Sequence, residues 1–219
     1  MSVILRCGPL EARDGEGREL YRGVVVEILE GKLTLLKGPS GSGKTTLLRQ
    51  LVGLNATEGC VRRLAGRDYT QKILPCWRGA VTLLMQDSPV LPGTIEHNLR
   101  FPFSCRSAEG RLFDDERAAE LLDIVGLGGI PMDRSAGALS GGERHRLALV
   151  RGLLWSPSIL VADEPLSGLD TVRAQRCFDL LLEFAHRPGR AVLCVLHDAV
   201  LGRGTDRTLN LVNGRLEAG

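Results

Sequence analysis

The stretch GPSGSGKT at residues 38–45 constrains the fold of this chain more than any other feature of its sequence. It matches the pattern GxxxxGK[ST] at every fixed position, follows the apolar run LTLLK and opens a helical pattern. In such a strand–loop–helix unit, glycines let backbone N–H groups turn inward, and the helix N-terminus attracts anions. We therefore predict that residues 38–45 form a phosphate-binding loop, called the phosphate loop below.

Two side chains of the phosphate loop have separate expected roles. The Lys44 ammonium reaches the β- and γ-phosphates of a nucleotide, and the Thr45 hydroxyl binds Mg²⁺. The other residues expected to contact the nucleotide are Gly38, Pro39, Ser40, Gly41, Ser42, Gly43 and Thr46.

A second motif, ILVADE at residues 159–164, supplies two carboxylates at the end of an apolar strand. Open α/β sheets bind ligands at this end of their strands. We expect Asp163 to hold Mg²⁺ and Glu164 to orient or deprotonate an attacking water. The simpler alternative is an acidic strand end that precedes Pro165.

Apolar runs and helical patterns alternate along most of the chain. Strands are expected at residues 24–29, 33–37, 80–85, 158–162, 191–196 and 208–212, and helices at 44–52, 115–125, 142–154 and 171–185. Strands that are apolar on both faces are typical of a parallel sheet covered by helices. The alternation predicts an α/β fold with right-handed crossovers.

The alternation stops between Gln86 and Leu139, where helical segments follow one another and prolines intervene. We expect residues 87–139 to form a helical subdomain inserted into an α/β core of residues 1–86 and 140–219. Residues 1–219 then form a single domain, a size that buries about 70% of the surface of the unfolded chain.

Composition excludes several classes of protein. The net charge is +2 and the charged residues are interspersed without a basic block, so we expect no nucleic-acid partner. No stretch approaches 18 uninterrupted apolar residues, so the chain is not expected to cross a bilayer. The six cysteines have neither a CxxC pair nor zinc-ligand spacing, and we expect reduced thiols in a cytosolic protein.

The segment LSGGE at residues 139–143 is a second glycine-rich turn, called the LSGGE turn below. It precedes a helical run, so Ser140, Gly141 and Gly142 lie at a helix N-terminus whose free N–H groups can bind an anion. Taken alone, the turn is equally well explained as an ordinary helix start capped by serine.

The complete set of motifs resembles that of ABC-transporter nucleotide-binding domains. In order along the chain it comprises GPSGSGKT, Gln86 after a strand, LSGGE, ILVADE, SGLD at residues 167–170, and His197 after a later strand. The resemblance covers nearly the whole chain. It implies a P-loop NTPase of ABC type that uses ATP and Mg²⁺, with a mainly parallel core, an antiparallel N-terminal β region and an inserted helical subdomain.

The resemblance also implies that the chain works as a homodimer. In this family two copies pair head to tail, and the LSGGE turn of one copy closes over ATP held in the phosphate loop of the other. Ser140, Gly141 and Gly142 then contact the partner's ATP. Glu143, at a position where many relatives have Gln, belongs to the same contact, and Asp170 crosses the interface.

Two further residues receive roles from the resemblance. Gln86 senses Mg²⁺ and the nucleophilic water and links to the membrane subunit, while His197 contacts the γ-phosphate within its own copy. With Lys44 and Glu164 they form the expected catalytic set.

The expected partner is a separately encoded membrane permease, with this chain bound peripherally on the cytoplasmic face of the bacterial inner membrane. The segment QDSPVLPGTIEHNLRFPF is similar to the corresponding segment of small bacterial cassettes linked to iron efflux, which implies export of a metal ion such as iron. One alternative is an ABC-type ATPase that regulates a soluble macromolecular complex without transport. A P-loop kinase is a third reading, but it gives no use to the LSGGE turn or His197.

For four aromatic residues, a functional and a core role both stay open. Phe101, Phe103 and Trp77 form either an apolar groove for a permease helix or part of a core. Tyr21 is the one aromatic candidate ahead of the phosphate loop to stack on adenine, and core packing is its more ordinary role.

Overall fold

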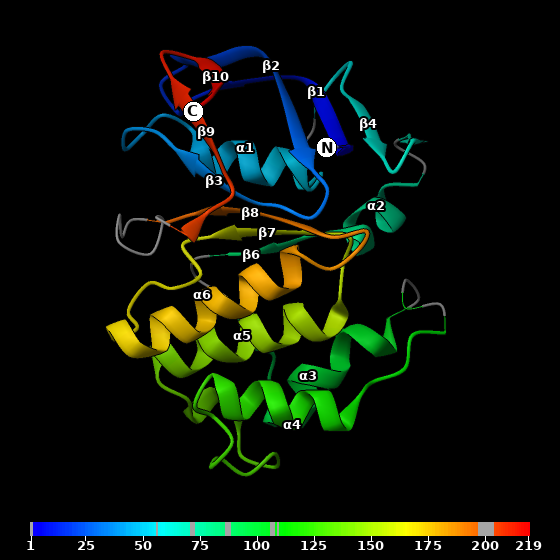
Figure 1. The fold of residues 1–219 in the computed structure, drawn as a ribbon, viewed down its shortest axis with the longest axis vertical. Helices are drawn as coiled ribbons and strands as arrows, with labels where there is room; N and C mark the ends of the chain where they lie inside the picture. The colour runs from blue at the N-terminus through cyan, green and yellow to red at the C-terminus, as the bar shows by residue number, and fades with distance from the viewer. Residues whose placement is uncertain are drawn as a thin grey trace.

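The computed structural model of the chain describes residues 2–55, 57–70, 73–85, 89–105, 108, 110–196 and 204–219. Two of the predicted site residues, Gln86 and His197, lie outside this part of the chain. Within it, the strands form two sheets, and helices cover both faces of the larger one (Figure 1).

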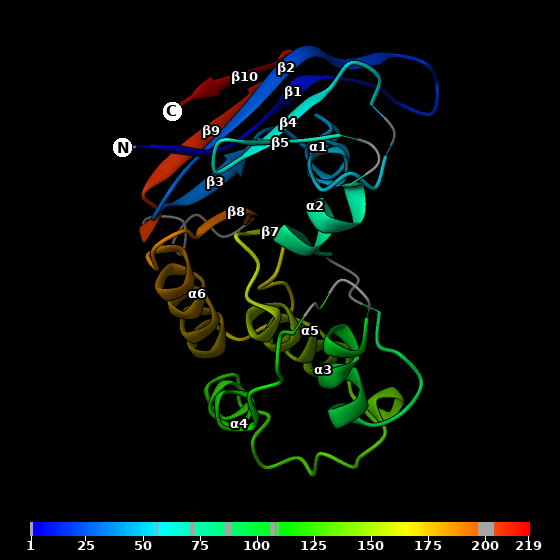
Figure 2. The same ribbon diagram turned by 90° about the vertical axis from the view of Figure 1, so that its right-hand side faces the viewer.

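The smaller sheet is antiparallel and has four strands in the order β2-β1-β4-β5. Its strands are β1 (Val3–Arg13), β2 (Glu19–Leu29), β4 (Val61–Leu64) and β5 (Arg67–Tyr69). One face of this sheet packs on helix α1 (Lys44–Leu51), which lies between the two sheets (Figure 2). The predicted antiparallel N-terminal β region is therefore confirmed.

The larger sheet has six strands in the order β10-β9-β3-β8-β7-β6. They are β3 (Leu33–Lys37), β6 (Val81–Leu84), β7 (Ile159–Asp163), β8 (Ala191–Val195), β9 (Arg207–Val212) and β10 (Arg215–Ala218). All neighbouring pairs are parallel except β9 and β10. Every residue of β7 and β8 is buried, as continuous apolarity predicts, and the mainly parallel core is confirmed.

The side chains of the central strands divide between two apolar cores. Ile159 and Val161 of β7 pack with α1, whereas Leu160 and Ala162 pack with α5 (Gly141–Trp155) and α6 (Thr171–Ala185). Successive side chains of a strand point to opposite faces of its sheet. Helix α1 therefore lies on one face, and α5 and α6 lie on the other (Figures 1 and 2).

Helices α3 (Ile95–Ser104) and α4 (Asp115–Ile124) lie at the end of the molecule opposite the four-stranded sheet (Figure 2). Each begins at a capping side chain, Thr94 for α3 and Asp114 for α4, that accepts a hydrogen bond from a backbone N–H of the first turn. Their apolar faces share one core with α5. The helical segments predicted after residue 86 thus rest on the helix that follows the LSGGE turn.

The other helices are short. Helix α2 (Leu74–Ala80) leads into β6, and the 3₁₀ helix η3 (Ala136–Ala138) leads into the LSGGE turn. Within the described ranges, no helix combines the length and the apolar character that a bilayer crossing requires.

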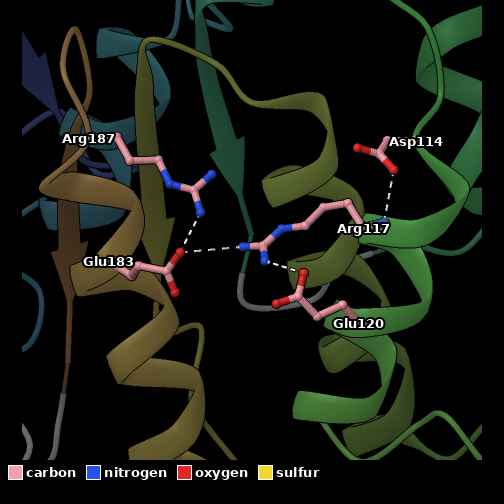
Figure 3. Close-up of polar contacts among 5 residues, drawn as sticks. All are labelled: Asp114, Arg117, Glu120, Glu183 and Arg187. Atoms are coloured by element: carbon pink, nitrogen blue, oxygen red, sulfur yellow. Dashed lines mark hydrogen bonds and ion pairs between the residues drawn. The ribbon is translucent and has the colours of Figure 1, made fainter.

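An ion-pair network joins α4 to α6 (Figure 3). The Arg117 guanidinium lies 2.6 Å from the Glu120 carboxylate on its own helix and 3.7 Å from that of Glu183 on α6. Glu183 also pairs with Arg187. Because solvent screens these partly exposed charges, the shared apolar core contributes more than the network to holding α4 in place.

Candidate functional site

The strands that precede the predicted site residues end at one edge of the six-stranded sheet. Leu35 of β3 pairs with Cys194 of β8, and Ala162 of β7 pairs with the same residue from the other side. Because these strands are parallel, the phosphate loop after β3 and the acidic pair at the end of β7 emerge at the same carboxyl edge. Open α/β sheets bind their ligands at this edge.

Close packing explains why two positions of the phosphate loop are glycine. A Cβ atom on Gly38 would lie 2.4 Å from the Leu211 carbonyl oxygen, which is closer than real side chains approach. Gly43 has a φ of 93° and is the N-cap of α1, with Tyr21 packed 3.0 Å from where its Cβ would lie. A larger residue at either position would force the loop out of this shape.

The phosphate loop presents hydrogen-bond donors suited to an anion. Among the residues that the structure describes, no side chain caps the N-terminus of α1, which leaves the N–H groups of its first turn available to a ligand. The Lys44 ammonium donates to the carbonyl oxygens of Gly38 at 2.9 Å and Pro39 at 3.0 Å, which folds it over the loop. The Ser42 hydroxyl is buried and has no hydrogen-bond partner among the described residues. Phosphate oxygens would satisfy these donors.

The donor set also fits a magnesium ion held jointly with a nucleotide. Asp163 ends β7 with 5% of its surface exposed, and Thr45 presents a hydroxyl in the first turn of α1. Over the described ranges, no group of three or more His, Cys, Asp or Glu side chains could hold a metal by itself. Mg²⁺ commonly uses one or two protein ligands together with water and substrate phosphates, which is the chemistry that Asp163 and Thr45 offer.

Glu164 has a backbone conformation that is unusual for its residue type. Its φ is 52°, in the left-handed region that costs a non-glycine residue about 1–3 kcal/mol. Two hydrogen bonds hold it there: its N–H donates to the Val195 carbonyl and its own carbonyl accepts from the Ser167 N–H, both at 3.1 Å. The chain therefore leaves the strand direction directly after Asp163, and a strained residue of this kind is typical of a functional site.

The LSGGE turn is a complete capping box. The Ser140 hydroxyl accepts a hydrogen bond from the Glu143 N–H at 3.3 Å, and the Glu143 carboxylate accepts one from the Ser140 N–H at 2.7 Å. The second of these bonds lowers the pKa of the Glu143 carboxyl below its ordinary value. Ser140 therefore caps α5, and the Glu143 carboxylate is already used in this cap. Gly141 is exposed and Gly142 is half-buried, and neither has a side chain that would cover the helix N-terminus.

The segment at residues 167–170 lies beside the LSGGE turn. A Cβ on Gly142 would lie 3.9 Å from the Gly168 carbonyl oxygen, and the His145 imidazole Nδ1 lies 3.5 Å from the carbonyl oxygen of Ser167. Asp170 caps α6 by accepting from the Arg173 N–H at 3.0 Å, which lowers the pKa of its carboxyl. Asp170 is exposed, so the structure brings it to the same surface as the LSGGE turn.

The phosphate loop and the LSGGE turn begin helices on opposite sides of the six-stranded sheet. Helix α1 begins in the phosphate loop and lies between the two sheets. Helix α5 begins in the LSGGE turn and lies on the other face of the six-stranded sheet (Figures 1 and 2). The two glycine-rich turns therefore lead into opposite faces of the same sheet. For Gln86 and His197, the described strands β6 and β8 end at the same carboxyl edge, and the roles of both residues stay predictions.

An apolar groove of about 560 Å³ opens between α2, β6, α3 and α5. Phe101, 41% exposed, lines this apolar groove, which is one of the two roles that the sequence left open. Trp155 lines it too, although it was not expected; its only signal in the sequence is its place at the end of the α5 helical pattern.

Of the other aromatic candidates, Trp77 belongs to the core and Phe103 is half-buried in an aromatic cluster. Trp77 is fully buried and donates its indole N–H to the Leu51 carbonyl at 2.9 Å, so the core role, one of the two left open for it, is the one the structure contains. Phe103 packs edge-on against Phe113 and Trp155, with ring centroids 5.4 and 5.7 Å apart.

Tyr21 packs in the core and does not offer a stacking surface. It is 1% exposed, and its hydroxyl donates to the Gln50 side-chain oxygen at 2.8 Å. Burial raises the pKa of this hydroxyl above its ordinary value. Of the two alternatives for Tyr21, core packing is the one the structure contains.

Comparison with known proteins gives consistent matches. A family model described as ABC transporter matches residues 21–167, more than half of the chain. The chain is 38% identical over 206 residues to the lipoprotein-releasing system ATP-binding protein LolD of Anaeromyxobacter dehalogenans (strain 2CP-C), covering 91% of this chain and 85% of that protein. It is 34% identical over 223 residues to the phosphonates import ATP-binding protein PhnC of Trichormus variabilis (strain ATCC 29413 / PCC 7937), covering 97% and 91%.

The fold is also similar to a solved structure. That structure is cbiO1 from Clostridium perfringens, part of the ABC transporter complex cbiONQ, and the TM-score is 0.78. The match covers 99% of this chain and 88% of that chain at 22% sequence identity, so it concerns the fold alone.

Proposed function

Since this chain belongs to the ABC transporter family of ATP-binding proteins, we propose that it hydrolyses ATP to power a separate membrane permease. The observation that carries this proposal is the joint position of the phosphate loop and the Asp163–Glu164 pair at one carboxyl edge of the sheet. Release of inorganic phosphate from ATP without any acceptor tests it. Phosphate transfer that occurs only to an added acceptor would favour a P-loop kinase instead.

The hydrolysis step follows from the groups at this edge. Lys44 and the N–H groups of the phosphate loop bind the β- and γ-phosphates, and Thr45 with Asp163 would hold Mg²⁺, which neutralises charge on the phosphates when bound. Glu164 orients a water molecule and accepts its proton as the water oxygen attacks the γ-phosphorus. The bond between the γ-phosphorus and the bridging oxygen breaks, and ADP and inorganic phosphate leave. Gln86 and His197 are proposed to assist at the same γ-phosphate.

We propose that two copies of the chain pair head to tail around two ATP molecules. The Ser140 hydroxyl and the N–H groups of Gly141 and Gly142 then contact the γ-phosphate held by the partner copy, and Asp170 lies at the same interface. ATP makes both sets of contacts only in the closed dimer, so ATP binding stabilises the closed dimer. Loss of the γ-phosphate after hydrolysis removes contacts and weakens the closed dimer. Opening and closing of the dimer is the motion that drives transport.

The apolar groove is the proposed docking site for the permease, which holds the chain at the cytoplasmic face of the membrane. The groove exposes the aromatic side chains of Phe101 and Trp155 between the sheet core and helix α3. Dimer closure would be transmitted to the permease at this position. The relatives support a transporter partner, since they are named as ATP-binding subunits of transport systems. The alternative of a regulator of soluble complexes has no support among them.

The proposed cargo is a metal ion such as iron, in the export direction, and it rests on the residue pattern after Gln86 alone. Two residues of that pattern also have structural roles: Thr94 caps α3, and the Asn98 side-chain oxygen accepts from the Leu91 N–H at 2.7 Å. The named relatives serve lipoprotein release and phosphonate import, so their cargoes differ. The cargo itself contacts the permease.

Replacement of Phe101 by Asp tests the docking site. We expect co-purification with the membrane protein encoded by the neighbouring gene to fall about tenfold or more, because a carboxylate would be desolvated at the centre of an apolar interface. Phe101 is partly exposed, so the midpoint of thermal unfolding should stay near that of the wild type. The matched control is Val3→Asp, at a similarly exposed apolar residue on the four-stranded sheet. Equal loss of co-purification in both variants would contradict the assignment.

A further inference from the structure

Two cysteines that are distant in the sequence meet where β1 and β4, the two central strands of the four-stranded sheet, begin to pair. The sulfur atoms of Cys7 and Cys60 lie 3.4 Å apart, although the residues are separated by 53 positions. The pairing of β1 with β4 fixes this contact, because Gly8 pairs with Val61 and Cys7 with Arg62. The contact therefore belongs to the sheet register rather than to a chance approach of loops.

The two thiols differ in access to solvent. Cys7 is fully buried, whereas Cys60 is partly exposed directly before β4. A reagent in solution can reach Cys60 first, and Cys7 is then the only thiol within bonding reach behind it. An accessible thiol with a buried resolving thiol is the arrangement of a redox-active pair.

The surroundings of Cys60 favour its thiolate form. The hydrogen bond from Cys7 is the largest cause that holds the pKa of Cys60 below its ordinary value, and the Arg62 guanidinium and Thr57 hydroxyl add to it. Arg62 is only 3% exposed; it donates to Thr57 at 2.7 Å, and its Nε atom is without a hydrogen-bond partner among the described residues. A buried cation with a spare donor beside two sulfurs stabilises negative charge on sulfur.

We propose that Cys7 and Cys60 are a reversible redox-modification site that forms an intrachain disulfide by exchange with a low-molecular-weight disulfide. The closed loop would contain β2, β3, the phosphate loop and α1, so the cross-link ties together the unit that binds the phosphates. The proposal is independent of transport and of the dimer.

The exchange is balanced in atoms and electrons. The Cys60 thiolate attacks one sulfur of the small disulfide, forming a mixed disulfide and releasing one small thiolate. Cys7 then loses its proton to solvent and attacks the Cys60 sulfur, forming the Cys7–Cys60 bond and releasing the second small thiolate. Two protein thiols are oxidised and one small disulfide is reduced to two thiols. The sulfurs need to approach from 3.4 Å to the bonded distance of about 2.05 Å.

Incubation of the purified full-length chain with glutathione disulfide tests the proposal. We expect an intact mass about 2 Da lower through loss of two hydrogens, a Cys7–Cys60 linked peptide after digestion without reductant, and full reversal by dithiothreitol. The midpoint of thermal unfolding should be roughly 5–10 °C higher in the oxidised form, because the cross-link restricts the unfolded chain.

The matched variants are Cys60→Ser, which should lose the linked peptide, and Cys76→Ser, which removes an exposed thiol on α2 and should keep it. Cys7→Ala should stop at a persistent mixed disulfide on Cys60. The proposal is overturned if glutathione remains on Cys60 of the wild-type chain without a link to Cys7, or if both thiols stay free while Cys76 reacts.

Discussion

Replacement of Glu164 by Gln is expected to lower the rate of ATP hydrolysis by about 10²- to 10⁴-fold, because the amide cannot accept the proton of the attacking water. Glutamine has nearly the same shape, and the two backbone hydrogen bonds that hold residue 164 do not involve its side chain. ATP binding should therefore persist, and the ATP-bound state should accumulate because it no longer turns over.

The measurement is steady-state phosphate release together with equilibrium binding of a fluorescent ATP analogue. Glu183→Gln is the matched control, since Glu183 lies exposed on α6 within the ion-pair network of Figure 3. A Glu164→Gln variant that hydrolyses ATP at the wild-type rate would remove Glu164 from the mechanism.

The second large effect is expected for Lys44→Ala, which should weaken ATP binding by about 10- to 100-fold. Hydrogen bonds to charged groups contribute about 1.5–3 kcal/mol, and Lys44 is already positioned over the loop by the carbonyls of Gly38 and Pro39. The loss should appear in the dissociation constant of the same ATP analogue, with hydrolysis falling in parallel.

Lys37 provides the matched control for Lys44. It is the exposed last residue of β3, directly before the phosphate loop, and Lys37→Ala removes the same charge from the same neighbourhood. If Lys44→Ala and Lys37→Ala bound ATP equally well, the loss would come from the missing positive charge in general. The proposal that Lys44 contacts the phosphates directly would then be wrong.

The elements that position the site could be predicted because their signals are local. β3, β7 and β8 are continuously apolar, and α1, α5 and α6 follow a helical period, so the strand–loop–helix unit and the acidic strand end were placed correctly to within a residue or two. The parallel core followed from the same patterns, and the antiparallel N-terminal region followed from the family resemblance.

The elements that were missed depend on contacts distant in sequence. β4 reads VRRL, and its buried Arg62 makes no apolar signal, yet pairing with β1 makes it a strand. β10 is short and lies at a sheet edge, and α2 contains a proline, a glycine and a tryptophan in seven residues. In each case tertiary packing overrides local preference.

Aromatic residues illustrate the same limit within the site. Phe101 and Trp77 are both large aromatic residues, and the sequence does not distinguish their surroundings. In the structure Phe101 lines the apolar groove, whereas Trp77 is buried in the core and donates a hydrogen bond to Leu51 of α1. Likewise, the sequence left open whether Ser140 caps a helix or binds an anion. The structure contains the cap, and a cap leaves neighbouring N–H groups free, so the two roles are compatible.

The central claim is that each active centre is built from two copies of the chain, and mixed dimers test it most directly. One subunit carries Lys44→Ala and the other Ser140→Asp, which keeps a good helix cap while placing a negative charge where the γ-phosphate is proposed to bind. Each variant alone should keep only a small residual activity. A purified dimer with one of each contains one centre made from an intact phosphate loop and an intact LSGGE turn, and should recover up to about half of the wild-type hydrolysis rate, given independent centres.

The decisive comparison is a dimer of wild type with a subunit that carries both substitutions. If centres are shared between copies, both of its centres contain one defect and it should be inactive, while the mixed dimer of single variants is active. If each copy instead contains a complete centre, the order reverses: the double-variant dimer keeps about half of the activity and the mixed dimer of single variants has none, which would contradict the account.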